Sequence, residues 1–132
     1  MHKSFAALAA LLVSQVPLWP SVAQGPAPEV VSVQLSNFKF SPSELTLHRG
    51  RAYRFHLVNA AGGGHDFSAP GLFAASTIAP GDRGLIVGGK VRLAGKQSVD
   101  IVLTPQTAGI YKLTCTHFLH SGMGMNGRII VQ

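Results

Sequence analysis

The chain has 132 residues, a single cysteine and a formal charge of +6. That length is enough for one domain and leaves no room for a second core. The basic residues are scattered, and only Arg49, Arg51 and Arg54 lie close together, so we expect no nucleic-acid-binding stripe. The positive charge is better suited to an acidic protein partner or an anionic surface, and the alternative is that it serves only solubility.

The N-terminal segment has the pattern of a secretory signal peptide. Lys3 precedes an almost wholly apolar run from Phe5 to Val16, Pro17 and Pro20 then interrupt any helix, and small residues follow up to Ala23. This pattern predicts export with cleavage after Ala23. A membrane anchor is the alternative, but the apolar run is too short to cross a hydrocarbon core of roughly 30 Å.

We therefore predict a signal peptide over residues 1–23, a flexible leader over 24–29 and a folded domain over 30–132. Cleavage would lower the charge from +6 to +5, because Lys3 is the only charged side chain removed. Such a protein is expected in the periplasm, or outside the cell where there is no outer membrane. We expect it to be a monomer with no membrane span after cleavage.

Short strands separated by turn residues follow the leader. In residues 51–58, Tyr53, Phe55 and Leu57 alternate with polar residues, which is typical of a half-buried strand. Residues 59–66 read as a loop, and 72–78 as one short helix. Further strands are predicted over residues 30–35, 44–48, 97–103, 109–115 and 128–131. The pattern predicts an all-β fold, an antiparallel Greek-key β-sandwich or barrel of about seven to eight strands with one short helix.

The single cysteine lies in a segment rich in metal-binding side chains. Exported proteins usually use cysteines in disulfide pairs, but Cys115 has no partner within the chain. His117, His120, Met123 and Met125 follow it within ten residues. Thiolate, imidazole and thioether are the ligands of a soft transition metal, and one Cys, two His and a weak axial Met form a mononuclear blue-copper site.

The strand motifs and this ligand spacing resemble those of the cupredoxins, the small blue-copper family that includes plastocyanin and azurin. Residues 38–50 resemble an early strand pair of the family, and residues 109–115 (GIYKLTC) resemble its G-x-Y-x-Y-x-C motif. The family's Cys-x4-His-x4-Met-x-Gly spacing is found here from Cys115 to Gly127. The resemblance implies a cupredoxin-like domain that binds one copper ion through His65, Cys115, His120 and Met125.

Three further residues lie close in sequence to the predicted ligands and could affect the metal site. His117 is a competing ligand, but it does not match the family spacing and is read as a solvent-facing residue or one that supports the site. Met123 is the alternative to Met125 as axial ligand and would otherwise pack beside the site. Asp66 stands where several family members have an asparagine that ties the two ligand loops together. Because neighbouring groups tune such sites strongly, this difference bears on the reduction potential.

The resemblance implies an electron carrier that shuttles single electrons between redox proteins, with the partner docking near His120. A copper chaperone, sensor or storage protein is the alternative, because His117 and Met123 could offer another Cu(I) site. We do not expect an enzyme. Multicopper oxidases and nitrite reductases reuse the fold, but there the residue after the cysteine is commonly a histidine, and here it is Thr116.

Overall fold

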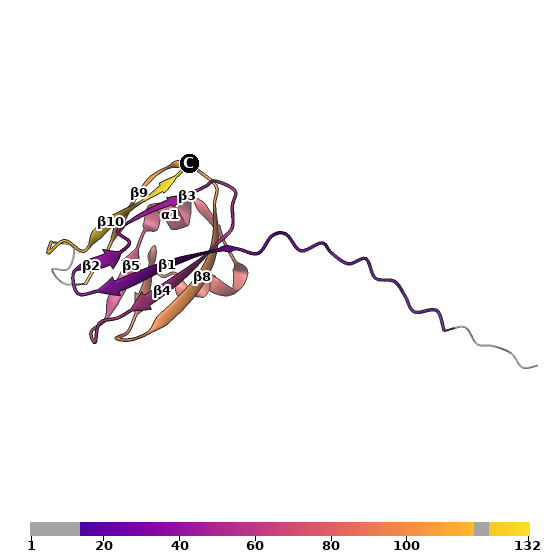
Figure 1. Ribbon diagram of the computed structural model, residues 1–132, viewed down its shortest axis with the longest axis horizontal. Coiled ribbons are helices and arrows are strands. Elements are labelled where there is room, and N and C mark those ends of the chain that lie inside the picture. The colour runs from indigo at the N-terminus through magenta and orange to yellow at the C-terminus, as the bar shows by residue number, and fades with distance from the viewer. Residues whose placement is uncertain (1–13, 118–121) are drawn as a thin grey trace, which may run out of the picture.

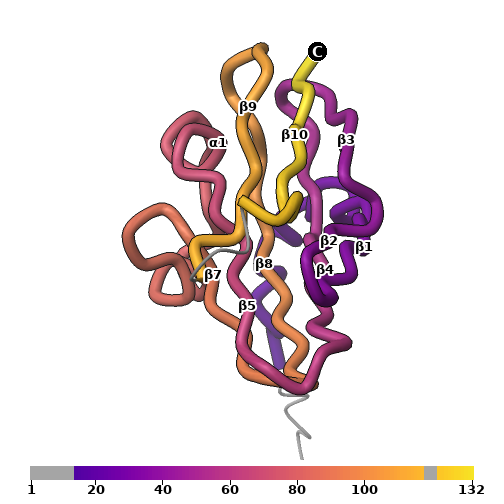
Figure 2. Tube along the Cα trace, turned by 90° about the vertical axis from the view of Figure 1, so that its left-hand side faces the viewer, coloured from indigo at the N-terminus to yellow at the C-terminus, as the bar shows by residue number. Residues whose placement is uncertain are grey.

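The computed structural model describes residues 14–117 and 122–132, which form a sandwich of two five-stranded sheets (Figures 1 and 2). The first sheet has the order β2 (Lys39–Ser41), β1 (Glu29–Ser36), β4 (Tyr53–Asn59), β8 (Ser98–Pro105), β6 (Ser76–Ile78). The second has the order β3 (Glu44–Leu47), β10 (Asn126–Val131), β9 (Gly109–Thr114), β5 (His65–Ser68), β7 (Lys90–Leu93). The predicted all-β sandwich is confirmed.

The strand count and pairing differ from the prediction in detail. The described residues form ten strands rather than seven or eight, because β2, β5, β6 and β7 have only three or four residues each. Such short segments carry too few alternating positions to be recognised from sequence. The sandwich is also not wholly antiparallel, since β1 pairs in parallel with β4, and β10 with β3.

The predicted helix is shorter than expected. The helix α1 covers Pro70–Ala74, and the residues after it form strand β6 instead of continuing the helix. Thr77 and Ile78 pair with Thr104 and Leu103 of β8, so the hydrogen bonds of a sheet edge replace those of a helix. A 3-10 helix, η1 (Pro80–Leu85), follows. Tertiary pairing therefore overrides local preference at residues 76–78.

The core lies between the two sheets and is built from alternate residues of each strand. Tyr53, Phe55 and Leu57 of β4 are at most 1% exposed, as their alternation predicts. Phe67 of β5 packs edge-on against Phe40 and Phe55, with ring centroids about 6 Å apart (6.1 and 5.9 Å). These contacts fix β5 against the first sheet, and β5 begins at His65.

The described residues before the first strand lie outside the sandwich. Residues 14–28 have no regular secondary structure, are largely exposed and project from the sandwich, which begins at β1 (Figure 1). In the part of the chain that the structure describes, no helix is long and apolar enough to span a bilayer.

Candidate metal centre

His65 is held by strand pairing at one end of the sandwich. It is the first residue of β5, pairs with Leu93 of β7 and is only 1% exposed. The sequence pattern predicted a loop through residues 59–66, but the structure places His65 and Asp66 in a strand between two neighbours. The position of the imidazole is therefore determined by the sheet.

Asn59 fixes the loop that leads to His65. Its buried amide donates hydrogen bonds to the carbonyl oxygens of Gly63 (2.8 Å) and Ala94 (2.9 Å), and its Oδ1 accepts one from the N–H of Ala61 (3.0 Å). These bonds join the β4–β5 loop to the end of β7. The sequence analysis did not single out Asn59, although it continues the inward-facing series Tyr53, Phe55, Leu57, and a polar residue in that series is the signal that could have revealed it.

Cys115 lies directly after β9 and is fully buried. Its Sγ lies 3.8 Å from Nδ1 of His65, a residue 50 positions earlier in the chain. The backbone N–H of Asp66 points to the same sulfur at 3.5 Å. Two of the four predicted ligands are thus adjacent, with the donor atoms that a copper ion would use facing each other.

Met125 lies at the other end of the segment that begins with Cys115. It is fully buried, whereas Met123 is 57% exposed. The N–H of Cys115 donates to the carbonyl oxygen of Met125 at 3.2 Å, which brings the two ends of the segment together. The burial difference favours Met125 over Met123 as the axial ligand.

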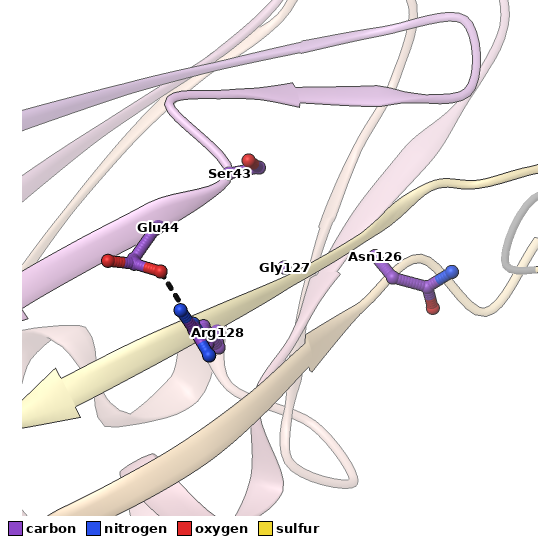
Figure 3. Close-up of a pocket in the computed structure, with 5 residues that line it drawn as sticks. All are labelled: Ser43, Glu44, Asn126, Gly127 and Arg128. Atoms are coloured by element: carbon purple, nitrogen blue, oxygen red, sulfur yellow. Dashed lines mark hydrogen bonds and ion pairs between the residues drawn. The ribbon is translucent and has the colours of Figure 1, made fainter.

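The strand after Met125 is anchored to β3. The N–H of Arg128 donates to the carbonyl oxygen of Ser43 (2.9 Å), and the Arg128 guanidinium forms an ion pair with Glu44 (Figure 3). Asn126, Gly127 and these residues line a shallow pocket beside the strand. This anchoring fixes where β10 begins and so where Met125 lies.

The remaining predicted ligand, His120, lies outside the described residues. Within residues 14–117 and 122–132, no three His, Cys, Asp or Glu side chains form a group that could hold a metal ion. The structure therefore places three of the four predicted donors, one of them a methionine. Of the other histidines, His117 is exposed with its ring centroid 6.2 Å from that of His65, and His56 contacts Asp100 on the surface.

Asp66 ties the two ligand segments together. Its carboxylate is almost fully buried and accepts hydrogen bonds from the backbone N–H (2.8 Å) and the hydroxyl (2.6 Å) of Thr116. Lys90 in turn donates to the Thr116 hydroxyl at 2.7 Å. The two carboxylate oxygens thus hold the residue after Cys115 beside the residue after His65, and the nearby Lys90 charge offsets that of the carboxylate.

Asn37 contacts the other side of the His65 ring. Its Oδ1 lies 3.4 Å from Nε2 of His65. A proton on Nε2 would be donated to this oxygen, which leaves Nδ1, the nitrogen facing Cys115, as the lone-pair donor. The geometry suits a neutral imidazole that binds a metal through Nδ1.

The electrostatic surroundings of Cys115 oppose a free thiolate. Burial raises the pKa of the Cys115 thiol above its ordinary value of 9.0, although hydrogen bonds from the backbone of Asp66 and His117 act in the opposite direction. The Asp66 charge raises this pKa further, and the Lys90 charge lowers it. A metal cation that binds here must displace the thiol proton, so the buried pocket favours a metal with high affinity for sulfur.

The donor set therefore fits a copper ion. The imidazole nitrogen of His65 faces the sulfur of Cys115, and Met125 is buried and joined to Cys115 by a backbone hydrogen bond. These donor types belong to the ligand combination of blue-copper sites. Oxygen-preferring ions such as Mg²⁺ are poorly matched by two sulfur ligands.

The sequence profile of the cupredoxin-like domain matches residues 4–131, nearly the whole chain. The chain belongs to the cupredoxin family. No curated protein sequence matches it.

Solved structures of two auracyanins and a multicopper oxidase have a similar fold. Dithionite-reduced auracyanin from the photosynthetic bacterium Roseiflexus castenholzii is 20% identical with a TM-score of 0.60, covering 81% of this chain and 99% of its own. Auracyanin A, a blue copper protein from Chloroflexus aurantiacus, is 20% identical with a TM-score of 0.59, covering 80% and 100%. A multicopper oxidase from Campylobacter jejuni is 11% identical with a TM-score of 0.61, covering 83% of this chain but 31% of its own. Most of that oxidase thus has no counterpart in this chain.

Proposed function

We propose that this cupredoxin binds one copper ion in a type 1 site and carries single electrons between redox proteins. His65, Cys115 and His120 would be the strong ligands and Met125 the weak axial one. The observation that supports this most is the approach of Nδ1 of His65 to Sγ of Cys115, at 3.8 Å in a buried site. His120 is included among the proposed ligands because it fits the Cys-x4-His-x4-Met spacing.

The arrangement suits electron transfer because the protein has little to rearrange. When bound, copper would supply the exchange of one electron. The chain's contribution is to hold Nδ1 of His65 through β5 and Asn37, to hold Cys115 through Asp66, and to exclude water from both. A fixed ligand geometry keeps the structural change between oxidation states small, which favours fast transfer.

The cellular location and the partner are part of the same proposal. Residues 1–23 would be a signal peptide, residues 24–29 a leader, and the folded domain a monomer in the periplasm or outside the cell. The redox partner would dock near His120. We propose no substrate chemistry on this chain, because Thr116 occupies the position after the cysteine and its hydroxyl is used by Asp66 and Lys90.

The decisive measurement is the electronic and paramagnetic resonance spectrum of the protein after addition of Cu(II). We expect strong thiolate-to-copper absorption in the visible region, and its complete loss in the Cys115→Ser variant. A colourless Cu(II) complex of the unmodified protein would refute the proposal.

The axial ligand is tested by two matched substitutions. Met125→Leu should change both the spectrum and the reduction potential, with a stability cost below about 1.5 kcal/mol because the volume is kept. Met123→Leu, at an exposed position, should leave both unchanged. The opposite result would assign the axial role to Met123.

A copper-handling role is the second candidate, because the soft side chain of Met123 and the imidazole of His117 are exposed. A carrier should retain copper in both oxidation states, whereas a chaperone should release Cu(I) to an acceptor. Mixing the reduced protein with a Cu(I) chelator separates the two. Rapid loss of the metal would favour the chaperone.

A further inference from the structure

The outward face of the second sheet is basic. Strand register places Arg92 opposite Asp66 and Lys90 opposite Ser68 on β7 and β5, and Lys112 opposite Arg128 on β9 and β10. The residues between them in sequence, such as Val91 and Leu113, point into the core. Four cations from three strands therefore share one face, and β7, β5 and β9 lie side by side (Figure 2).

The acidic residues of this face do not neutralise it. Glu44 is used by its ion pair with Arg128, and Asp66 is buried beneath Thr116. Arg92 and Lys112 are exposed, and within the described ranges neither forms an ion pair. The surface that a partner would meet is thus positive around these two side chains.

The outward face of the first sheet is different. On it, His56 is matched with Asp100 at 2.7 Å, and Arg54 is an exposed cation whose neighbours across the sheet, Val30 and Val102, are uncharged. Arg54 therefore offers a control that has the same charge as Arg92 but lies on the opposite sheet.

The basic face also lies one covalent step from the site. Cys115 is bonded to Thr116, which is exposed and whose hydroxyl accepts a hydrogen bond from Lys90. A shallow pocket opens here, lined by Asp66, Lys90, Arg92, Thr116 and His117. A molecule seated on it would lie one residue from the buried sulfur.

An exposed apolar side chain lies on the same face. Ile110 shares the outward side of β9 with Lys112 and is 71% exposed. A cation beside an exposed apolar side chain suits a docking surface in which charge guides the encounter and apolar area gives the contact.

We propose that the outward face of β7, β5 and β9, centred on Arg92 and Lys112, docks an acidic redox partner protein. This inference rests on the proposed electron-carrier function and adds, beside Thr116, a second docking surface to the one proposed near His120, for a partner of opposite charge. The partner's carboxylates would face Arg92 and Lys112, with Ile110 between the two surfaces. Electrons would pass through Thr116 and Cys115.

The first test maps where an anion collects. Hexacyanochromate(III), a paramagnetic trianion that does not exchange electrons under these conditions, is added to the reduced copper-loaded protein, and amide signals are followed by NMR. We expect broadening centred on residues 90–92 and 110–116. The same titration on the metal-free protein tests the surface even if the copper proposal fails. Broadening centred on residues 49–54, or spread over all exposed amides, would overturn the inference.

The second test measures electron transfer. Hexacyanoferrate(II) gives one electron to the Cu(II) protein, forming hexacyanoferrate(III) and the Cu(I) protein, with no bond made or broken. At low ionic strength the Arg92→Gln/Lys112→Gln variant should react about 3- to 10-fold more slowly, because rim charges govern association rates. The Arg54→Gln control should change the rate less than about 2-fold, and the difference should vanish in high salt.

Lys90 is left unchanged in these variants because it contacts Thr116 and its removal could disturb the site itself. A visible spectrum identical to that of the unmodified protein shows that the variants keep the site. If the spectrum is of the blue-copper type but the double variant and the Arg54 control react alike, the docking inference is wrong while the proposed function holds. If a peptide of ten glutamates fails to displace hexacyanochromate from residues 90–92, the partner is not a carboxylate-rich surface.

Discussion

The two segments that carry the predicted ligands are fixed in different ways. The His65 arm (residues 59–66) enters β5, which lies between β7 and β9, and Asn59 joins its loop to β7. The Cys115–Met125 arm is instead closed at its two ends, where the N–H of Cys115 meets the carbonyl oxygen of Met125. One ligand position is set within a strand, whereas Cys115 directly follows β9 and Met125 directly precedes β10.

This difference indicates that substitutions in the two segments should affect the stability of the sandwich to different extents. Changes near His65 act on the sandwich itself, because β5 pairs with β7 along its whole length and with β9 at Ser68. Residues 122–124 of the other arm form a turn outside any strand, and such segments tolerate alteration at smaller cost to the fold. The predictions below test this contrast, beginning with the largest effect.

Gly95→Ala should be the most damaging change. A Cβ at Gly95 would overlap the carbonyl oxygen of Gly62, which belongs to the His65 arm. Because the overlapping group is backbone, we expect a loss of about 3 kcal/mol in the free energy of unfolding. Denaturant unfolding measures it, with Gly63→Ala as control, since a Cβ there meets nothing within 4 Å. Equal stability of the two variants would show that the His65 arm is not tightly packed.

Asp66→Ala should rank second, because it removes the tie between the two arms. The substitution leaves the N–H and hydroxyl of Thr116 without their acceptors, and we expect a loss of about 2 kcal/mol. Asp66→Asn keeps one carbonyl acceptor and should lose about half as much. If both variants were as stable as the unmodified protein, the arms would be held by other contacts.

Gly124→Ala should cost less, about 1 kcal/mol. Gly124 lies in the Cys115–Met125 arm with a φ of +99°, which an L-residue adopts with strain, but a Cβ there meets no neighbour within 4 Å. The penalty is thus local to the loop. A loss as large as that of Gly95→Ala, in the same unfolding experiment, would contradict the contrast between the two arms.

Alkaline pH should have the smallest effect, confined to the metal-free protein. Burial raises the pKa of the Cys115 thiol in the folded state, so the folded protein holds this proton more strongly than the unfolded chain does. The resulting stability is fully present below the unfolded value of 9.0 and is lost as the pH rises through the higher folded pKa. Unfolding at about pH 8 and about pH 10.5 measures this loss. The Cys115→Ala variant should show less of it, and an identical slope for both proteins would assign the effect to other groups.

Much of this protein could be predicted from local sequence pattern. The alternation of Tyr53, Phe55 and Leu57 predicts which face of β4 is buried, because successive side chains of a strand point to opposite sides. The spacing of Cys115, His120 and Met125 indicates a single metal-binding loop, because its ligands are close in sequence. The lone cysteine at the end of a predicted strand gives the same indication.

Only the tertiary structure decided which distant residues meet. His65 approaches Cys115 because β5 pairs with β9. The sequence indicated His65 only through the resemblance to cupredoxins, because a pairing between strands so far apart in the chain leaves no trace in either segment alone. The buried roles of Asn59 and Asp66, the strand at residues 76–78 and the grouping of Arg92 with Lys112 likewise follow from sheet order and register. Sequence therefore determined the chemical character of the ligands and the class of fold, whereas strand pairing determined the geometry, because hydrogen bonds between strands are made with residues that the local pattern does not contain.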